Sequence, residues 1–386
     1  MNDFAIHRAP RQNNTTGFFS EVWIFILIFF PFLWDYYIFS LRIFDIISFF
    51  IIIFITMLTI IKKSKKITAP PKILFFLSFI VLYATFGLLV SQDFRSFLGI
   101  IMGVIYFALL PSIISSENIM RIMRIVLIVM VSAFLIQFVY AQLFNDIINY
   151  HSLTGGVPRL ESGRGLRSSG LFLEPTSYVT TLTMILIIQF ISKKFGRLEF
   201  IGIITMYLSM SFFAYFAATI LLFIYMYGLK ENMNMRWFLF LFLFIFTVLS
   251  VFVWIFSDLV NIFFIERLIN ISEDPSVIAR FGFFSNFNFD NSIIFFGHGL
   301  SSFNSGFFGY SGLGSLLSNF GIFGIFIFIF IFISVFRRNF LLAGTGFSII
   351  LMAGPLWTYL VLWSWFSMLY VLSEDKKKNC LQSSIV

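Results

Sequence analysis

Cysteine and charge are scarce in this chain of 386 residues. The single cysteine, Cys380, lies in the polar C-terminal tail, which excludes a disulfide framework and a thiolate metal site. Charged residues make up only 11% of the chain, whereas a soluble domain usually carries about 25%. Residues 1–20 show no small-residue cleavage site, so we predict no removable signal peptide.

The chain is rich in hydrophobic residues. Hydrophobic residues make up 59% of the chain, and the mean hydropathy is +0.96. Apolar runs of about 20 residues recur from end to end, and each is long enough to span roughly 30 Å of hydrocarbon. The sequence therefore predicts an all-α polytopic integral membrane protein, with residues 1–386 forming a single transmembrane domain of about 12 transmembrane helices. Their expected centres are Phe29, Ile52, Leu82, Tyr106, Val131, Leu186, Met206, Leu221, Phe246, Ile325, Ile349 and Leu362.

The segment 201–228 is long for one helix and short for two. Charge decides between these alternatives, because cytoplasmic loops are enriched in Lys and Arg. A single span would place the basic residues of KKFGR, residues 193–197, on the opposite side from Lys230. We therefore predict a tight helical hairpin in this segment.

The same charge rule orients the other spans. With both termini on the inner side, every lysine and most of the arginines fall inside. The basic residues on the outer side are all arginines, and most of them lie in two long loops, residues 146–176 and 258–312. These are the third and the fifth outward-facing loops of the predicted topology.

Both loops combine Gly and Ser with aromatic residues, a composition that suits sugar rings and close backbone approach to a ligand. Arginine grips phosphate bidentately and stays charged in a low dielectric. The loop arginines are therefore expected to converge on a diphosphate. The alternative is that they snorkel to lipid headgroups or pair with Glu161 and Glu174. The proposed ligand-binding residues of these loops are Arg159, Arg164, Arg167, Gly170, Arg280 and Tyr310.

Two further residues are candidates for proton transfer. Glu174 precedes Pro175 at the expected start of a helix, where the helix dipole stabilises a carboxylate and Thr176 or Ser177 would cap the first turn. Its functional alternative is to orient Arg167 or to accept a proton from a hydroxyl. His298 lies between glycines in FFGHGLSSF and is the second candidate.

Several common sites are missing from the sequence. The outer loops contain no Asp-x-Asp pair for a metal, no histidine cluster for zinc and no phosphate-binding or dinucleotide fingerprint. The net charge of +8 does not indicate nucleic acid in so apolar a chain. We therefore expect no metal and no cofactor, and a substrate that arrives already activated, as a lipid-linked diphosphate does.

At these residues the chain resembles a known family. RSSGLFLEPTSYVT, residues 167–180, is similar to the Arg-x-x-Gly-x-Phe-x-Glu-Pro-Ser/Asn segment of Wzy-type O-antigen polymerases. Downstream, SVIARFGFF, FFGHGLSSF and SGLGSLLSNFGIFGIFIF resemble the family's later arginine, Gly-x-Gly turn and Gly-hydrophobic-hydrophobic-Gly helix. The resemblance extends over roughly residues 120–370.

The resemblance implies a metal-independent glycosyltransferase in the bacterial inner membrane, with cytoplasmic termini and periplasmic loops. It would join oligosaccharide repeat units carried on undecaprenyl diphosphate, in contact with membrane lipid and with a possible chain-length regulator. Arg167 and Arg280 would stabilise the departing diphosphate. Glu174 or His298 would take the proton of the acceptor hydroxyl, and the sequence does not choose between them.

Two other functions stay open. An O-antigen ligase shares the donor, but ligases usually carry a histidine just ahead of the helix that corresponds to SLLSNFGIFG, where this chain has GYSG, residues 309–312. A flippase for the same lipid-linked units would carry charges at mid-membrane and internal repeats. The predicted spans are nearly free of ionisable residues, which favours chemistry at the outer surface.

Overall fold

The computed structural model is helical, which confirms the all-α prediction; strand pairing in its described residues is limited to two hairpins of two-residue strands. Placement is described for residues 15–38, 41–63, 94–152, 161–162, 165–230, 312–336, 339–354 and 359–383, and for isolated residues between 77 and 89 and at 295 and 297.

The first helix is ended by a proline. Helix α1 (Thr15–Phe29) runs into a 3-10 turn, η1 (Phe30–Leu33), because Pro31 has no N–H with which to continue the α-helical ladder. The Leu27 carbonyl, which residue 31 would normally satisfy, accepts a hydrogen bond from the Tyr106 hydroxyl instead. Phe29, the expected centre of the first span, is therefore the last residue of α1.

A short antiparallel hairpin follows, β1 (Tyr37–Ile38) with β2 (Leu41–Arg42), in which Tyr37 pairs with Arg42. It leads into α2 (Ile43–Lys63). Helix α4 (Phe94–Ile113) and helix α5 (Ser116–Phe144) come next. The side chain of Ser115 caps α5 by accepting a hydrogen bond of 3.3 Å from the Asn118 N–H.

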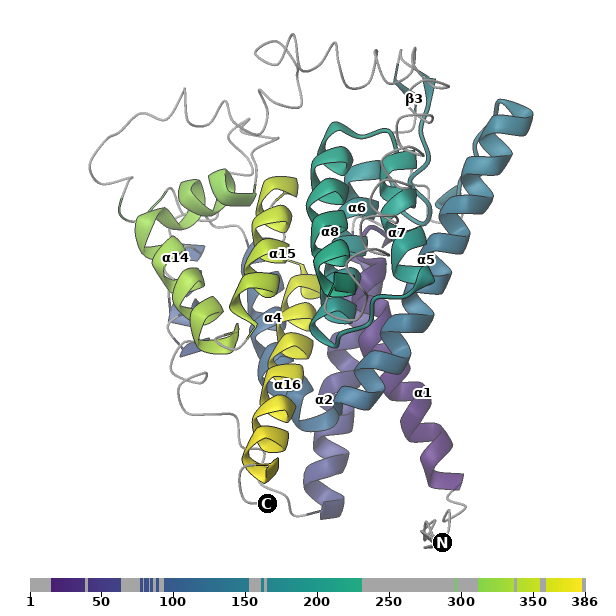
Figure 1. Cartoon of the computed structure of the whole chain (residues 1–386). Helices are drawn as coiled ribbons and strands as arrows, with labels where there is room; N and C mark the ends of the chain where they lie inside the picture. The colour runs from purple at the N-terminus through teal and green to yellow at the C-terminus, as the bar shows by residue number, and fades with distance from the viewer. Residues whose placement is uncertain are drawn as a thin grey trace, which may run out of the picture.

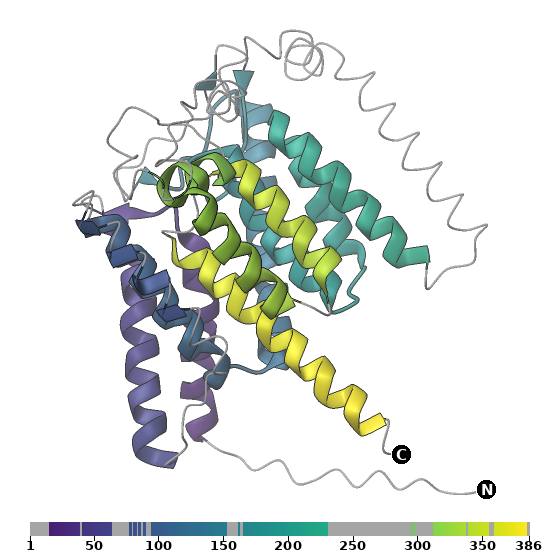
Figure 2. The same ribbon diagram turned by 90° about the vertical axis from the view of Figure 1, so that its left-hand side faces the viewer.

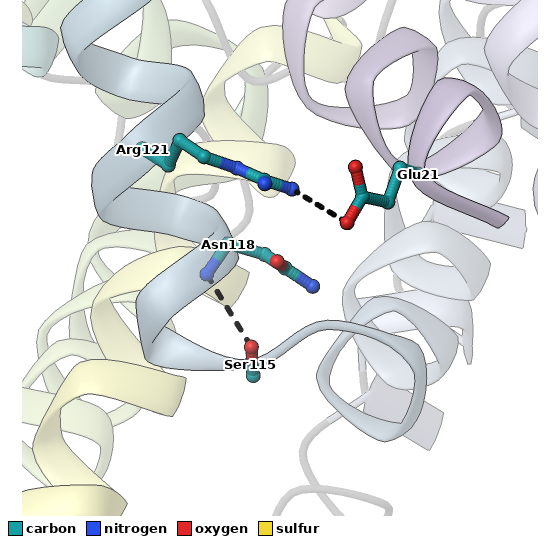
Figure 3. Close-up of polar contacts among 4 residues, drawn as sticks. All are labelled: Glu21, Ser115, Asn118 and Arg121. Atoms are coloured by element: carbon teal, nitrogen blue, oxygen red, sulfur yellow. Dashed lines mark hydrogen bonds and ion pairs between the residues drawn. The ribbon is translucent and has the colours of Figure 1, made fainter. Parts of the chain in front are cut away.

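Helices α1 and α5 begin side by side and run in the same direction. Figure 3 shows the ion pair that links their N-terminal halves, between Arg121 Nη2 and Glu21 Oε1 at 3.5 Å. Both side chains are more than half exposed, so the pair contributes little to stability. The parallel directions of α1 and α5 agree with the predicted topology. Successive membrane spans alternate in direction, so a first and a fifth span run the same way.

Helix α6 (Pro175–Ile191) occupies the middle of the bundle. It follows a second hairpin, β3 (Glu161–Ser162) with β4 (Gly165–Leu166), and packs against α5, α7, α8 and α15. Nearly every residue of α6 is buried, on all sides of the helix. A helix that is apolar all round is stable only when other elements enclose it, and α6 is so enclosed.

The hairpin predicted for residues 201–228 is confirmed. Helix α7 (Arg197–Leu208) and helix α8 (Phe212–Lys230) pack together across a three-residue turn in which Met210 has φ 51°. The hydroxyls of Tyr207 and Thr219 hydrogen bond between the two helices at 2.9 Å. At 12 residues, α7 is about 18 Å long, so it is shorter than the hydrocarbon layer.

The C-terminal helices α14 (Gly312–Phe336), α15 (Phe340–Ala353) and α16 (Leu360–Ser383) lie together in Figure 2. Close packing here depends on small residues. A Cβ added to Gly103 of α4 would lie 2.1 Å from the Trp363 ring of α16, and one added to Gly346 of α15 would lie 2.8 Å from Ile187 of α6. Glycine therefore lets these helices approach.

The two ends of the molecule differ. Helix α1 begins and helix α16 ends at one end, and β3 and β4 lie at the other (Figure 1).

Each predicted span centre lies within a described helix, apart from Phe246, which is outside the described residues, and Leu82, which is helical but isolated. Two described helices, Ser96–Ile113 and Ser116–Phe144, are long and apolar enough to cross a membrane by length and composition. The number of about 12 spans stays a prediction.

Helix α14 bends at Gly321, where φ is 62° and ψ is −166° (Figure 1). A Cβ at this position would lie 2.4 Å from the Phe295 carbonyl oxygen, so the close approach requires glycine. Two residues earlier, Asn319 is fully buried, and neither polar atom of its side chain has a hydrogen-bond partner. A buried polar group without a partner destabilises the folded state.

Replacing Asn319 with leucine, a side chain of similar size, is therefore expected to stabilise the protein by about 1–3 kcal/mol, because the desolvation cost of the amide disappears. Thermal unfolding in detergent measures this. Asn118→Leu, at a partly exposed position in the first turn of α5, is the matched control and should leave the midpoint nearly unchanged. A lower midpoint for Asn319→Leu would show that the amide stabilises the fold.

Candidate functional site

The segment between β4 and α6, residues 167–174, folds against α5 at Phe134 and Gln137. Gly170 is in the left-handed region, with φ +59°, and a Cβ there would sit 3.4 Å from the Phe134 backbone. The Ser169 hydroxyl donates to the Phe172 carbonyl at 2.5 Å, and the Phe172 N–H donates to the Ser169 carbonyl at 3.3 Å. The left-handed conformation is therefore what favours glycine at position 170, because a Cβ there would be at ordinary contact distance.

A single buried glutamine holds this turn. Gln137 of α5 is 1% exposed, and its Oε1 accepts hydrogen bonds from the Ser169 N–H at 2.7 Å and the Gly170 N–H at 2.9 Å. Its Nε2 donates to the Ile148 carbonyl at 2.8 Å. One side chain therefore joins both ends of the connection between α5 and α6 to the bundle, and all three contacts are to backbone groups that would otherwise need partners.

A buried aspartate holds the other end of the turn. Asp35, between η1 and β1, is 7% exposed, and its Oδ2 accepts a hydrogen bond from the Leu173 N–H at 2.8 Å. The Ser177 hydroxyl, in the first turn of α6, acts on the same carboxylate. Burial, and to a smaller extent the charge of Glu174, raises the pKa of Asp35 to about 6, although the Leu173 and Ser177 hydrogen bonds and the Arg42 guanidinium act in the opposite direction.

Glu174 is the N-cap residue of α6 by its backbone, with φ −135° and ψ 146°. Pro175 then takes the first helical position, where its missing N–H costs nothing. The expectation that Thr176 or Ser177 caps the helix is wrong, because both residues already lie inside the first turn. The Glu174 side chain makes no capping hydrogen bond. Its carboxylate nevertheless lies at the helix N-terminus, where the dipole favours negative charge.

Aromatic rings form the layer beneath the turn. Phe172 is 1% exposed and contacts Trp34 and Tyr178, at ring-centroid distances of 6.3 Å each. Tyr178 in turn stacks on Phe134 of α5 at 4.7 Å. The Trp34 indole donates to the Thr181 hydroxyl of α6 at 3.0 Å. These contacts fix the end of α1 against the first turns of α6.

Arg42, on β2, extends the site toward the C-terminal helix. Its guanidinium lies 3.4 Å from the centroid of the Tyr359 ring, just ahead of α16, in a cation–π contact. The positive charge of Arg42 favours the ionised form of two buried carboxyl groups, those of Asp35 and Asp45. Trp34 meets the same tyrosine ring edge-on at 4.9 Å. The first outward segment and the start of α16 therefore meet beside the turn.

His151 is structural. Its ring is 1% exposed, stacks on Tyr36 at 4.2 Å and contacts the Leu171 carbonyl through Nε2 at 3.0 Å. Burial lowers the pKa of His151, and the Leu171 hydrogen bond opposes this in part. The neutral ring thus links the β1 region to the turn, and it is not placed for proton transfer to a solvent-exposed ligand.

Three of the predicted site residues are described by the structure, and all three lie on the segment 167–174: Arg167, Gly170 and Glu174. Arg167 is partly buried at the start of the turn. The remaining predicted residues lie outside the described part of the chain: Arg159, Arg164, Arg280, His298 and Tyr310. Within the described ranges, no group of three or more His, Cys, Asp or Glu side chains is arranged to hold a metal ion.

Three residues that shape the site were not predicted from the sequence: Asp35, Arg42 and Gln137. Asp35 and Gln137 did carry a signal, because a polar or ionisable residue within or next to an apolar helix usually has a partner or a function. Their partner is the turn at residues 169–173, which is separated from Asp35 by more than a hundred residues of sequence. Such a distant pairing is not visible without the fold.

The chain matches no protein-family model, no curated protein and no solved structure. The site is therefore interpreted from its own chemistry. It offers an arginine, two neighbouring carboxylates and a glycine turn at the N-terminus of a buried helix. This combination is suited to an anionic ligand and to a proton transfer beside it.

Proposed function

We propose that the chain is a membrane-embedded polymerase of polysaccharide repeat units, which transfers a glycan from undecaprenyl diphosphate to an incoming lipid-linked unit. The observation that carries the proposal is the turn at residues 167–174. Arg167 and Glu174 lie on one segment, which Gln137 and Asp35 hold rigidly at the start of α6. Catalytic groups need such support from their surroundings to keep a productive geometry.

A location in the membrane is supported by the outer surface of the bundle. Large apolar side chains are widely exposed on several helices, among them Phe50 at 65%, Leu143 at 71% and Leu341 at 82%. Soluble monomers rarely expose apolar patches on this scale, and lipid chains would cover them. The proposed orientation puts β3 and the turn on the periplasmic side and both chain ends in the cytoplasm.

In the proposed reaction, the hydroxyl of the acceptor sugar attacks the anomeric carbon of the donor glycan. The bond from that carbon to the diphosphate oxygen breaks, and undecaprenyl diphosphate leaves with the electron pair. Arg167, together with Arg280 from the fifth loop, neutralises the charge that develops on the diphosphate. Glu174 accepts the proton of the attacking hydroxyl. No metal is required in this scheme, because the arginines supply the positive charge.

Deletion of the gene and complementation with the wild-type chain tests this function, with surface polysaccharide resolved on a gel. A polymerase predicts that the deletion strain carries lipid A–core with a single repeat unit, and that the wild-type chain restores the ladder. Long polymer on undecaprenyl diphosphate beside bare core would identify a ligase instead. Absence of any repeat unit from the core would identify a flippase, and either result would overturn the proposal.

A further inference from the structure

A buried aspartate stands in the first turn of α2, a helix that the sequence predicts to span the membrane. Asp45 is 2% exposed, and its Oδ2 accepts one hydrogen bond, from the Leu360 N–H at the start of α16. That bond is 3.5 Å long, beyond the usual range of about 2.7–3.2 Å. Oδ1 has no hydrogen-bond partner among the described residues. Capping of α16 therefore uses only part of this carboxylate, and a buried charge needs pairing or coordination.

Two buried hydroxyl groups lie one helical turn from this contact. Ser48 follows Asp45 by three residues on α2, so the two side chains share one face of that helix. Ser364 follows Leu360 by four residues on α16, on the face that meets Asp45. Both serines are 0% exposed, and neither hydroxyl has a hydrogen-bond partner in the described part of the chain.

Tyr106 of α4 links the α2 side of this group to the α16 side. Its hydroxyl donates to the Leu27 carbonyl of α1, so the oxygen keeps its lone pairs. The Asp45 carboxylate and the Ser364 hydroxyl both lie near enough to act on it, although Ser364 makes no hydrogen bond. Helix α4 packs against α2 and α16, so three helices bring oxygen atoms to one place.

The neighbouring arginine does not balance the negative charge of this region. Arg42 acts on Asp45, but it acts on Asp35 as well, and Asp35 also lies beside Glu174. Two buried carboxylates therefore share one guanidinium. A water molecule would give the hydroxyls a partner, but it would leave the negative charge in place. A cation would do both.

We propose that this oxygen cluster binds an alkali-metal cation between α2, α4 and α16. Its ligands are Asp45 Oδ1 and the hydroxyl oxygens of Ser48, Tyr106 and Ser364. Oxygen is the ligand atom that hard cations prefer. A divalent ion is less suited, because its second charge would face Arg42 with only one carboxylate to offset it. The site lies outside the reaction scheme proposed above and does not depend on it.

Thermal unfolding of the purified full chain in detergent tests the site, with NaCl, KCl and choline chloride compared at equal ionic strength. A ligand that binds only the folded state stabilises it by an amount that grows with the logarithm of its concentration. We expect the melting temperature to rise as NaCl or KCl replaces choline chloride. Choline screens surface charge equally, but it is too large for a buried site.

Three variants locate the response. Asp45→Asn should abolish it, because the substitution removes the charge and keeps the shape of the side chain. Ser48→Ala should raise the salt concentration needed for half of the effect by about tenfold or more. Ser367→Ala is the matched control, since Ser367 is also buried on α16 but its hydroxyl already donates to the Trp363 carbonyl at 2.9 Å. It should keep the wild-type response.

Three results would overturn the inference. An equal effect of choline chloride would reduce the response to charge screening, and no effect of any salt would leave water or a proton beside Asp45. A wild-type response in Asp45→Asn would place the cation elsewhere. Should Asp45→Asn fail to fold, Ser48→Ala still decides, because it removes a hydroxyl that has no partner. No substrate enters these measurements, so their outcome is separate from that of the polymerase test.

Discussion

Arg167→Ala is expected to abolish the polysaccharide ladder in the complemented deletion strain while the protein still reaches the membrane. Removing a preorganised donor to a developing anion typically costs about 100- to 1,000-fold in rate, and the diphosphate leaving group has no metal to share its charge in the proposed scheme. Arg167→Lys keeps the charge but loses the planar fork, so an intermediate ladder of short chains is expected. The comparison is made on gels at matched membrane expression.

The matched control for this prediction is Arg121→Ala. Arg121 lies in the second turn of α5, toward the end of the bundle where α1 and α5 begin, and its partner Glu21 is as exposed as it is. Loss of that ion pair should leave the ladder intact, because exposed pairs contribute little. A full ladder in Arg167→Ala would remove this arginine from the site and would leave Arg280 as the only one of the two assigned to the leaving group.

Gln137→Leu is expected to produce the largest loss of stability among single changes near the site. The substitution removes three hydrogen bonds and leaves the Ser169 and Gly170 N–H groups and the Ile148 carbonyl without their partner. Each buried backbone group left unsatisfied costs about 1–3 kcal/mol, so the total loss should be about 3 kcal/mol or more. Thermal unfolding in detergent measures it, and the ladder should disappear as well.

Gln142→Leu provides the comparison within the same helix. Gln142 is exposed near the end of α5, so its replacement should leave both the melting temperature and the ladder close to those of the wild type. A small effect of Gln137→Leu, similar to that of Gln142→Leu, would mean that the turn at residues 167–170 keeps its conformation without the glutamine. The site would then be held chiefly by Asp35 and by the aromatic layer around Phe172.

The sequence was informative wherever a property depends on neighbours in the chain. Apolar runs predicted the helices, and the charges of KKFGR and Lys230 predicted the α7–α8 hairpin, because insertion depends on local hydropathy and on flanking basic residues. The glycine turn and Pro175 likewise predicted the connection into α6. Phe29, the predicted centre of the first span, is instead the last residue of α1, because Pro31 ends the α-helix.

The sequence by itself therefore determined the helical architecture and the segment that carries Arg167, Gly170 and Glu174. Only the tertiary structure decided how that segment is held. Gln137 of α5 binds the N–H of Gly170, and Asp35, just after η1, binds the N–H of Leu173. Arg42 contacts the Tyr359 ring, which lies more than three hundred residues later in the chain. Each of these contacts exists because a buried polar group must find a partner, and the partner is chosen by packing in space, which the order of residues along the chain does not reveal.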